Sequence, residues 1–150
     1  NFFWDDTNNN LKVIKRKFTI TSNVDGNVDG DVVYFGGTTS MTIGTIYHYK
    51  SDGTWEVADP NAVANSDGLL AVALGAASDT NGMLLRGMVT LDHDPGAVGD
   101  VLYLSAASIG DATATAPAGT GDIVRIIGYC LDASDGQIWF NPDSTFVELS

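Results

Sequence analysis

The 150-residue chain is acidic, with seven Lys and Arg against nineteen Asp and Glu and a formal net charge of −12. This length fits a single domain with a core of its own, and so negative a surface disfavours binding to nucleic-acid phosphates. A single cysteine excludes an intrachain disulfide and a Cys-rich zinc site, and no apolar run approaches the roughly 20 residues of a membrane-spanning helix.

The first residues carry neither an initiator Met nor the basic start and apolar segment of a signal peptide, so we interpret the chain as a piece of a longer polypeptide. Two parts are expected: an N-terminal, fibre-like strand segment over residues 1–22 and a compact β domain over residues 23–150. In the first part, an Asx-rich turn leads into a strand over 11–20. Its basic side chains are expected to solvate one exposed face: Lys12, Lys15, Arg16 and Lys17.

From residue 23 onward, short apolar runs closed by Gly, Asp or Ser recur about every ten residues, which is typical of an all-β domain. Seventeen of the nineteen acids are Asp, a turn residue and a poor helix former, which favours loops between strands over helices. We therefore predict an all-β fold, a small β-barrel or sandwich. Its strands are expected over residues 31–35, 45–50, 54–58, 69–74, 83–91, 101–105, 123–131, 137–140 and 145–149.

Three connections in this domain are predicted to differ from simple hairpins. Residues 23–30 repeat Asn-Val-Asp-Gly, and Asp-Gly pairs favour tight turns. Residues 59–67 are expected to form one short helical turn, with Asp59 as its cap and Pro60 in the first position. Residues 106–121 are rich in Ala, Thr, Gly and Ser, which predicts a long exposed loop or an arm that crosses a neighbouring subunit.

Oxygen-bearing side chains alternate over residues 25–31, as in the first half of a calcium-binding loop. Gly30 stands at the sixth position, where such loops need a tight wrap, but Gly36 stands where the closing bidentate Glu is required. Two interpretations stay open, a weak calcium site and a plain Asp-Gly turn. The candidate ligands are Asp25, Asn27, Asp29 and Asp31.

Asp92-His93-Asp94 is the most reactive-looking cluster, because two carboxylates beside an imidazole can bind a metal or polarise a base. Neighbouring residues on an extended chain point to opposite faces, so we expect the three side chains to scatter. His48 is expected to pack within a strand, and Cys130 to be buried as a small apolar side chain. No nucleophile motif is present, and no spacing singles out a glycosidase pair among the Asp residues. The sequence therefore predicts neither an enzyme nor a cofactor.

The tryptophans raise one further kind of binding. Trp55 and Trp139 are candidates for stacking on sugar rings, because amphipathic aromatic side chains stay partly exposed at binding surfaces. A Trp within a strand equally fits a core or a subunit interface. Both interpretations stay open.

Two segments resemble bacteriophage virion proteins. Phe3 to Val13 (FWDDTNNNLKV) is similar to a short strand unit, F-W-D-D-(S/T)-x-N-x-L-x-V, found along phage tail fibres. From Gly30 to Val147 the chain resembles a small β domain of phage fibre and capsid-decoration proteins, although Ala71 stands where such domains often carry Gly. The motifs that carry this second resemblance are, in order, Gly30–Tyr34, Asp67–Leu74, Leu84–Gly87, Val98–Ser105, Ile127–Leu131 and Phe140–Asp143.

The resemblance implies a β-barrel-like fold, assembly as a homotrimer on a virion, and no catalytic residues. We therefore expect a structural protein of a phage virion, a β domain of a tail or neck fibre that contacts other virion proteins. Two alternatives stay open: a capsid-decoration (cement) protein, and a carbohydrate-binding or carbohydrate-cleaving tip that meets a glycan of the host surface. Neither nucleic-acid binding nor membrane insertion is expected.

Overall fold

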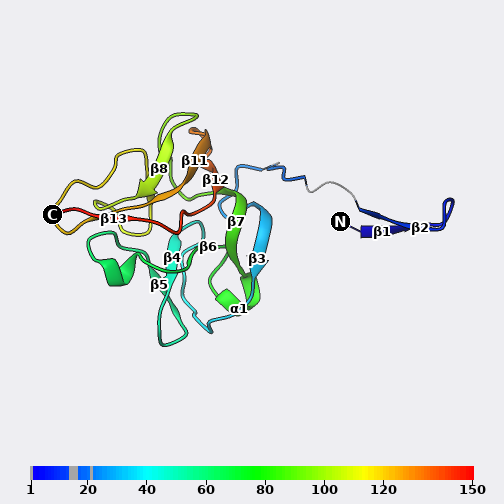
Figure 1. Ribbon diagram of the computed structural model, residues 1–150, viewed down its shortest axis with the longest axis horizontal. Coiled ribbons are helices and arrows are strands. Elements are labelled where there is room, and N and C mark those ends of the chain that lie inside the picture. Colours follow the sequence, from blue (N-terminus) through cyan, green and yellow to red (C-terminus); the bar gives the residue numbers. More distant parts are fainter. Residues whose placement is uncertain (1, 14–16, 21) are drawn as a thin grey trace.

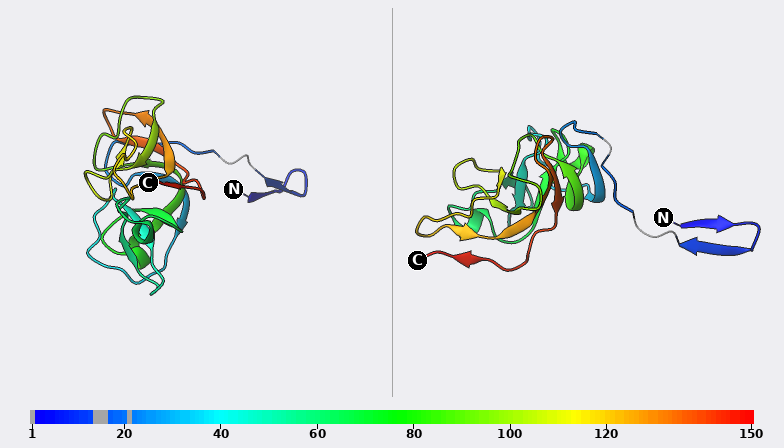
Figure 2. Two further views of the ribbon diagram at one scale, coloured as in Figure 1. Left: turned by 60° about the vertical axis from the view of Figure 1, so that its left-hand side comes forward. Right: turned by 90° about the horizontal axis from the view of Figure 1, so that it is seen from above.

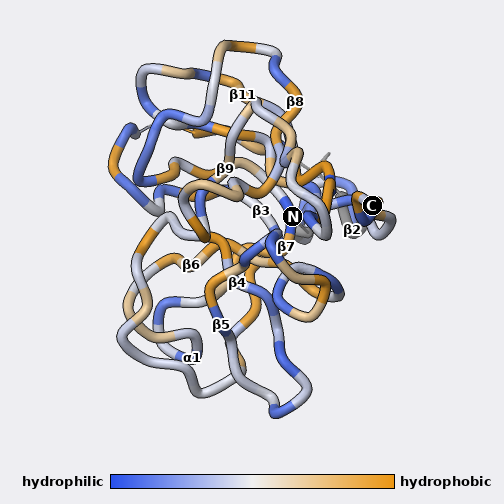
Figure 3. Tube along the Cα trace, turned by 90° about the vertical axis from the view of Figure 1, so that its left-hand side faces the viewer, coloured by the Kyte–Doolittle hydropathy of each residue, from blue (hydrophilic) through white to orange (hydrophobic). Residues whose placement is uncertain are grey.

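The computed structural model describes residues 2–13, 17–20 and 22–150, and this part of the chain is nearly all β, with 36% strand and 5% helix. Its main sheet is strongly curled, like half of a barrel, which confirms the all-β fold predicted from the sequence. Figure 3 shows apolar stretches along the strands of this sheet and hydrophilic stretches in the loops around it. Within the described residues, no helix is long and apolar enough to cross a membrane.

The N-terminal segment begins with a hairpin that stands apart from the main sheet (Figure 1). Strand β1 (Phe2–Asp5) pairs antiparallel with β2 (Asn10–Val13). The carboxylate of Asp5 holds the turn, because it accepts hydrogen bonds from the Thr7 backbone amide at 3.1 Å and the Asn8 side chain at 2.9 Å. The expected Asx turn is therefore present. Of the basic residues that follow, Lys15 and Arg16 lie outside the described residues.

The main sheet has nine strands, in the order β5-β4-β6-β7-β12-β11-β8-β9, with β3 paired to β7 off this path. Two further strands, β10 and β13, pair with each other at the end of the chain (Figure 2). The strands are β3 (Val28–Val33), β4 (Ile46–Tyr49), β5 (Trp55–Val57), β6 (Leu70–Ala73), β7 (Met83–Thr90), β8 (Val101–Leu104), β9 (Ala112–Thr113), β10 (Ile123–Val124), β11 (Ile126–Asp132), β12 (Gln137–Phe140) and β13 (Val147–Glu148).

Strand β7 organises the sheet, because three other strands pair with it. Strand β3 pairs with β7 from Met83 to Val89. On the opposite edge of β7, Met83 and Leu84 pair with β6, and the residues from Gly87 to Thr90 pair with β12. The sheet thus divides along one edge of its longest strand, with β6, β4 and β5 on one side of the division and β12, β11 and β8 on the other.

A row of glycines crosses the strongly curled sheet. Gly30 pairs with Gly87, Gly87 with Phe140, and Phe140 with Gly128. A Cβ atom on Gly87 would lie 2.5 Å from the Cα of Gly30, and one on Gly128 would overlap the Trp139 carbonyl oxygen. The backbones therefore approach more closely than side chains allow, and Phe140, the largest of the fully buried side chains, lies between two of these glycines.

Two cores cover the two faces of the sheet. The inner core includes Ile46, Leu84, Leu102, Ile127 and Phe140 and fills the concave face. A second core packs on the other face of the β4–β7 part, around Met41, Tyr47, Trp55, Ala71, Ala73 and Met83. Cys130 belongs to the inner core and is 1% exposed, which confirms the burial expected for it; this burial raises the pKa of its thiol.

Strand β3 starts earlier than predicted, and the prediction of a second turn at Asp29 and Gly30 is wrong. The turn is made by Asp25 and Gly26, whose φ is 76°, and the chain is already extended at Val28. Asp29 and Gly30 therefore lie inside the strand, where they pair with Met88 and Gly87. Sequence pattern alone did not separate the two Asn-Val-Asp-Gly copies, because the second is extended only through its pairing with β7.

The strand predicted over 123–131 is divided at Arg125, which separates β10 from β11. Its guanidinium is buried and donates to three backbone carbonyls, those of Asp143 at 2.6 Å, Ser66 at 2.9 Å and Gly68 at 2.9 Å. Burial lowers the pKa of Arg125 from its ordinary value, although this group stays charged at neutral pH. The Arg125 side chain thus connects two loops, one at residues 66–68 and one at Asp143, to the start of β11.

The loop predicted over 106–121 is not a free arm. It contains β9, which pairs with β8, and Gly110, Ala112 and Pro117 are buried in it. The Gly110 amide donates to the Ala58 carbonyl at 2.8 Å, and the Ile46 amide donates to the Gly110 carbonyl at 2.8 Å. The middle of this loop therefore packs against β4 and β8, whereas residues 107–109, 115–116 and 118–120 are exposed, as predicted.

Helical structure is short, as expected. The turn predicted over 59–67 is a 3-10 helix, η1 (Val63–Asn65), preceded by Ala62 as its cap. Asp59 instead closes an Asx turn by accepting from the Asn61 amide at 2.9 Å, so the predicted capping role was wrong. A single α-helical turn that the sequence pattern did not predict, α1 (Ser78–Asn81), connects β6 to β7.

The glycine row leads to a stability prediction. Replacing Gly128 by Ala is expected to destabilise the protein by about 3 kcal/mol or more, because the new methyl group meets backbone atoms that cannot move away. Gly68→Ala is the control: no heavy atom lies within 4 Å of its Cβ position, and its φ of 61° should cost only about 1–2 kcal/mol. Urea unfolding measures both, and equal losses would contradict the steric explanation.

Candidate functional site

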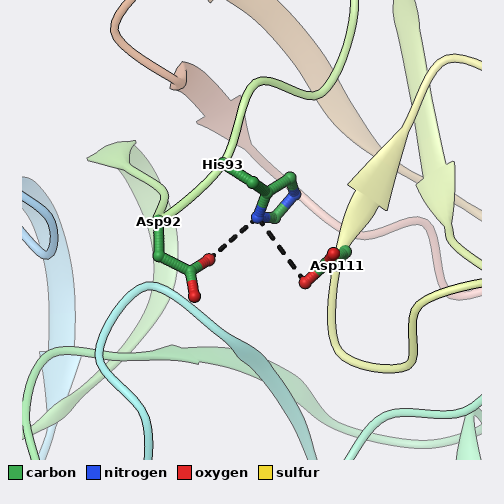
Figure 4. Close-up of side chains that lie close together, drawn as sticks. All are labelled: Asp92, His93 and Asp111. Atoms are coloured by element: carbon green, nitrogen blue, oxygen red, sulfur yellow. Dashed lines mark hydrogen bonds and ion pairs between the residues drawn. The ribbon is translucent and has the colours of Figure 1, made fainter.

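Three ionisable side chains converge at one edge of the sheet (Figure 4). The Nδ1 atom of His93 lies 2.8 Å from Oδ1 of Asp92 and 3.6 Å from Oδ1 of Asp111. Among the described residues, these three form the group of His, Cys, Asp and Glu whose ligand atoms lie within 4.8 Å of one another. All three side chains are partly exposed, with 20% of His93, 28% of Asp92 and 33% of Asp111 accessible.

The chain brings these residues together from two segments. Asp92 and His93 follow β7, at a bend that begins after Leu91, and Asp111 precedes β9. The imidazole is held from behind by Ala112: its Nε2 lies 2.9 Å from the Ala112 amide nitrogen and 3.1 Å from the carbonyl oxygen of the same residue. Strand β9 therefore orients the ring, so that Nδ1 faces the two carboxylates.

Electrostatics at this cluster are dominated by negative charge. Partial burial raises the pKa of Asp111; the nearby His93 acts in the opposite direction and Asp92 adds to the rise. Beside the cluster, a polar cleft of about 170 Å³ runs under the loops at the ends of β7 and β11. Further acids line this cleft with Asp92 and His93: Asp25, Asp94 and Asp135.

The prediction that the Asp92, His93 and Asp94 side chains scatter was wrong for the first two residues and right for Asp94. Asp92 and His93 do converge, because the chain bends after β7 and the alternation of an extended strand no longer holds. Asp94 lies outside the converging group, and the second carboxylate comes from Asp111, which the sequence analysis did not single out. No local signal marks Asp111, because its partner lies eighteen residues away and the two meet only through the pairing of β8 with β9.

The four calcium candidates do not form a loop around a common point. Asp25 is in the turn before β3, whereas Asp29 and Asp31 are in the strand. A carboxylate oxygen of Asp29 accepts a hydrogen bond from the Thr19 amide at 2.7 Å. Asp29 thus ties the N-terminal segment to β3, and the second half of the candidate set lies along a strand and not around an ion. Asn27 is in the chain between them, and its amide donates to the Val24 carbonyl at 2.9 Å.

The two tryptophan candidates have different environments. Trp55 is 3% exposed, its indole N–H donates to the Phe35 carbonyl at 2.9 Å, and its ring packs on Phe35 and Tyr49. The prediction that Trp55 could stack on a sugar is therefore wrong, because this side chain belongs to the second core. Trp139 is half-buried on β12, with the Phe18 ring 5.5 Å away and the Arg86 guanidinium 5.6 Å from its centroid.

Trp139 belongs to an apolar surface on the outer side of the sheet. Tyr129 pairs with Trp139 on one side and with Val101 on the other, so these side chains share the face opposite the inner core. Tyr103 and Ile126 continue this surface into a groove of about 290 Å³ near the C-terminus. We call this surface the outer apolar face; its members are Tyr103, Ile126, Tyr129, Trp139, Phe146 and Val147.

Much of the outer apolar face is open to solvent. Tyr129 is 45% exposed, Phe146 38% and Val147 60%. The N-terminal segment lies against one end of it, where Phe18 contacts Trp139.

His48 is a packed strand residue, as expected: it is 2% exposed, and its Nε2 lies 3.4 Å from a carboxylate oxygen of Glu56.

Comparison of the chain with family models, with characterised proteins and with solved structures gave no match.

The arrangement of the calcium candidates leads to a prediction. Because Asp25, Asp29 and Asp31 are spread over a turn and a strand, the double substitution Asp25→Asn and Asp29→Asn is expected to leave any effect of calcium on the melting temperature unchanged. Differential scanning calorimetry with millimolar Ca²⁺ and with EDTA measures this. A calcium-dependent rise in melting temperature that disappears in the double variant would contradict the prediction.

Proposed function

We propose that this chain is a structural module of a bacteriophage virion, a β domain of a tail or neck fibre that assembles as a homotrimer. The role is one of assembly and contact, not of catalysis. The observation that carries the proposal is the outer apolar face, because monomeric proteins rarely leave a continuous group of large apolar side chains exposed. The proposed location on a virion rests on the resemblance to phage fibre and decoration proteins.

The position of the N-terminal segment supports a fibre. Residues 17–20 reach the domain on the outer face, with Phe18 on Trp139 and the Thr19 amide bonded to Asp29. The hairpin β1–β2, which carries the fibre-like FWDD motif, precedes this segment. A three-fold axis along this face would bring three outer apolar faces together and three hairpins to the same end.

The side chains of the face also fit a contact between copies of the chain. Tyr129 is 45% exposed and Trp139 lies beside it, and aromatic side chains such as these are enriched where protein surfaces meet. With a formal charge of −12 per chain, a contact between copies has to be made through apolar surface, because the charged surfaces repel one another. A capsid-decoration role uses the same face for the same contact and differs in where the trimer is attached.

Assembly is tested by measuring the mass of the full chain in solution. Light scattering is expected to give three times the 15.8 kDa of one chain. Tyr129→Glu and Val147→Glu are each expected to dissociate the trimer, because a charge would be buried in the contact. Val98→Glu is the matched control, since Val98 is 70% exposed and lies outside the outer apolar face. A wild-type monomer at micromolar concentration overturns the assembly, and a trimer that survives both substitutions overturns this choice of face.

Location is tested by immunogold electron microscopy of phage particles that carry the chain. Antibodies against the purified domain are expected to label the tail or neck fibres. Labelling of the capsid surface would replace the fibre by the decoration role, with the trimer unchanged. Absence of label from intact particles, with label on the free protein, would remove the virion setting.

A further inference from the structure

We propose that Asp92, His93 and Asp111 form a binding site for one divalent transition-metal ion of the Zn²⁺ type. The ligand atoms are Oδ1 of Asp92, Nδ1 of His93 and Oδ1 of Asp111 (Figure 4). This site is independent of the proposed assembly, because none of the three residues belongs to the outer apolar face.

The spacing of the three atoms fits a single small ion. Zn²⁺ binds nitrogen and carboxylate oxygen at about 2.0–2.2 Å, so two of its ligands lie about 3.0 Å apart at a right angle and about 3.4 Å apart at the tetrahedral angle. The observed separations from Nδ1 of His93 are 2.8 Å to Asp92 and 3.6 Å to Asp111. The two carboxylate oxygens lie within 4.8 Å of each other, so both Asp side chains have to rotate to place the three atoms around one centre.

The backbone of β9 supplies the partner that a metal-binding histidine needs. When Nδ1 binds a metal, the proton of the neutral ring is on Nε2, which then has to donate a hydrogen bond. The Ala112 carbonyl oxygen lies 3.1 Å from Nε2 and can accept it. In the tautomer with the proton on Nδ1, Nε2 accepts from the Ala112 amide at 2.9 Å and Nδ1 donates toward Asp92. The same residue therefore serves both tautomers of His93.

Charge also favours a cation at this position. Within the described part of the chain, no Lys or Arg forms an ion pair with Asp92 or Asp111. The neighbouring cleft adds the carboxylates of Asp25, Asp94 and Asp135. A divalent ion would neutralise the two bound carboxylates, and the partial exposure of all three ligands leaves a route from solvent and room for a water molecule as the fourth ligand.

The donor set selects the type of ion. Calcium prefers six to eight oxygen ligands at 2.3–2.6 Å, and magnesium keeps most of its waters, so an imidazole nitrogen with two carboxylates suits neither. Imidazole with carboxylate suits zinc and its neighbours in the first transition series. The ion would connect the segment after β7 to the start of β9, and so stabilise the edge of the sheet at which β9 is paired through only two residues.

The test uses the full chain, freed of metal with EDTA, and calorimetric titration with ZnCl₂. One Zn²⁺ per chain is expected, with a rise in melting temperature that follows Zn²⁺ concentration. Asp92→Asn and Asp111→Asn are each expected to weaken Zn²⁺ binding by at least about tenfold, since loss of an outer partner alone costs roughly 10–100-fold. Asp94→Asn is the matched control: it removes a carboxylate from the neighbouring cleft and is expected to change the affinity less than twofold.

A second measurement reports on His93 itself. Long-range ¹H–¹⁵N NMR of the two histidines is expected to show the His93 ring change from the Nδ1–H to the Nε2–H form when Zn²⁺ is added, while His48 stays unchanged. The proposal is overturned if Zn²⁺ does not bind, if Asp94→Asn weakens binding as much as Asp111→Asn, or if the His93 signals do not respond. Full displacement of Zn²⁺ by an equal concentration of Ca²⁺ would overturn the assignment of the metal.

Discussion

The close approach of backbones along the glycine row is the constraint on which the rest of this structure depends. Gly30, Gly87 and Gly128 let neighbouring strands come within distances that side chains would prevent, and Phe140 lies in the same row. A sheet that curls this tightly encloses its own core, because one face becomes concave and is filled by its own side chains. The fold therefore needs few helices to cover it.

The curl has a consequence for the opposite face. A second core covers that face beside β4 to β7, whereas the part formed by β7, β12, β11 and β8 is contacted by the N-terminal segment at Trp139 and by the C-terminal segment near Tyr103 and Ile126. Aromatic and aliphatic side chains such as Tyr129 and Val147 remain exposed there. An apolar surface left over in this way is stabilised by association, which is the physical basis of the assembly proposed above.

The Asp92–His93–Asp111 cluster is likewise a product of strand pairing. Strand β9 returns along β8 and places Ala112 behind the imidazole, so a short strand both orients His93 and supplies the carboxylate of Asp111. Arg125 acts similarly elsewhere in the molecule, where one buried guanidinium fastens backbone carbonyls from separate loops. In both places a polar side chain connects segments that lie far apart in the sequence.

The sequence by itself determined the fold class and most strands, because apolar alternation and Asp-Gly turns are local properties of the chain. Strand β12 was predicted with its observed bounds, and the burial of Cys130 followed from its apolar neighbours. Tertiary structure decided what depends on distant partners. Only pairing with β7 makes Asp29 a strand residue, only packing on Phe35 buries Trp55, and only the return of β9 brings Asp111 to His93. Local pattern has no access to such contacts, since each joins residues far apart in the chain.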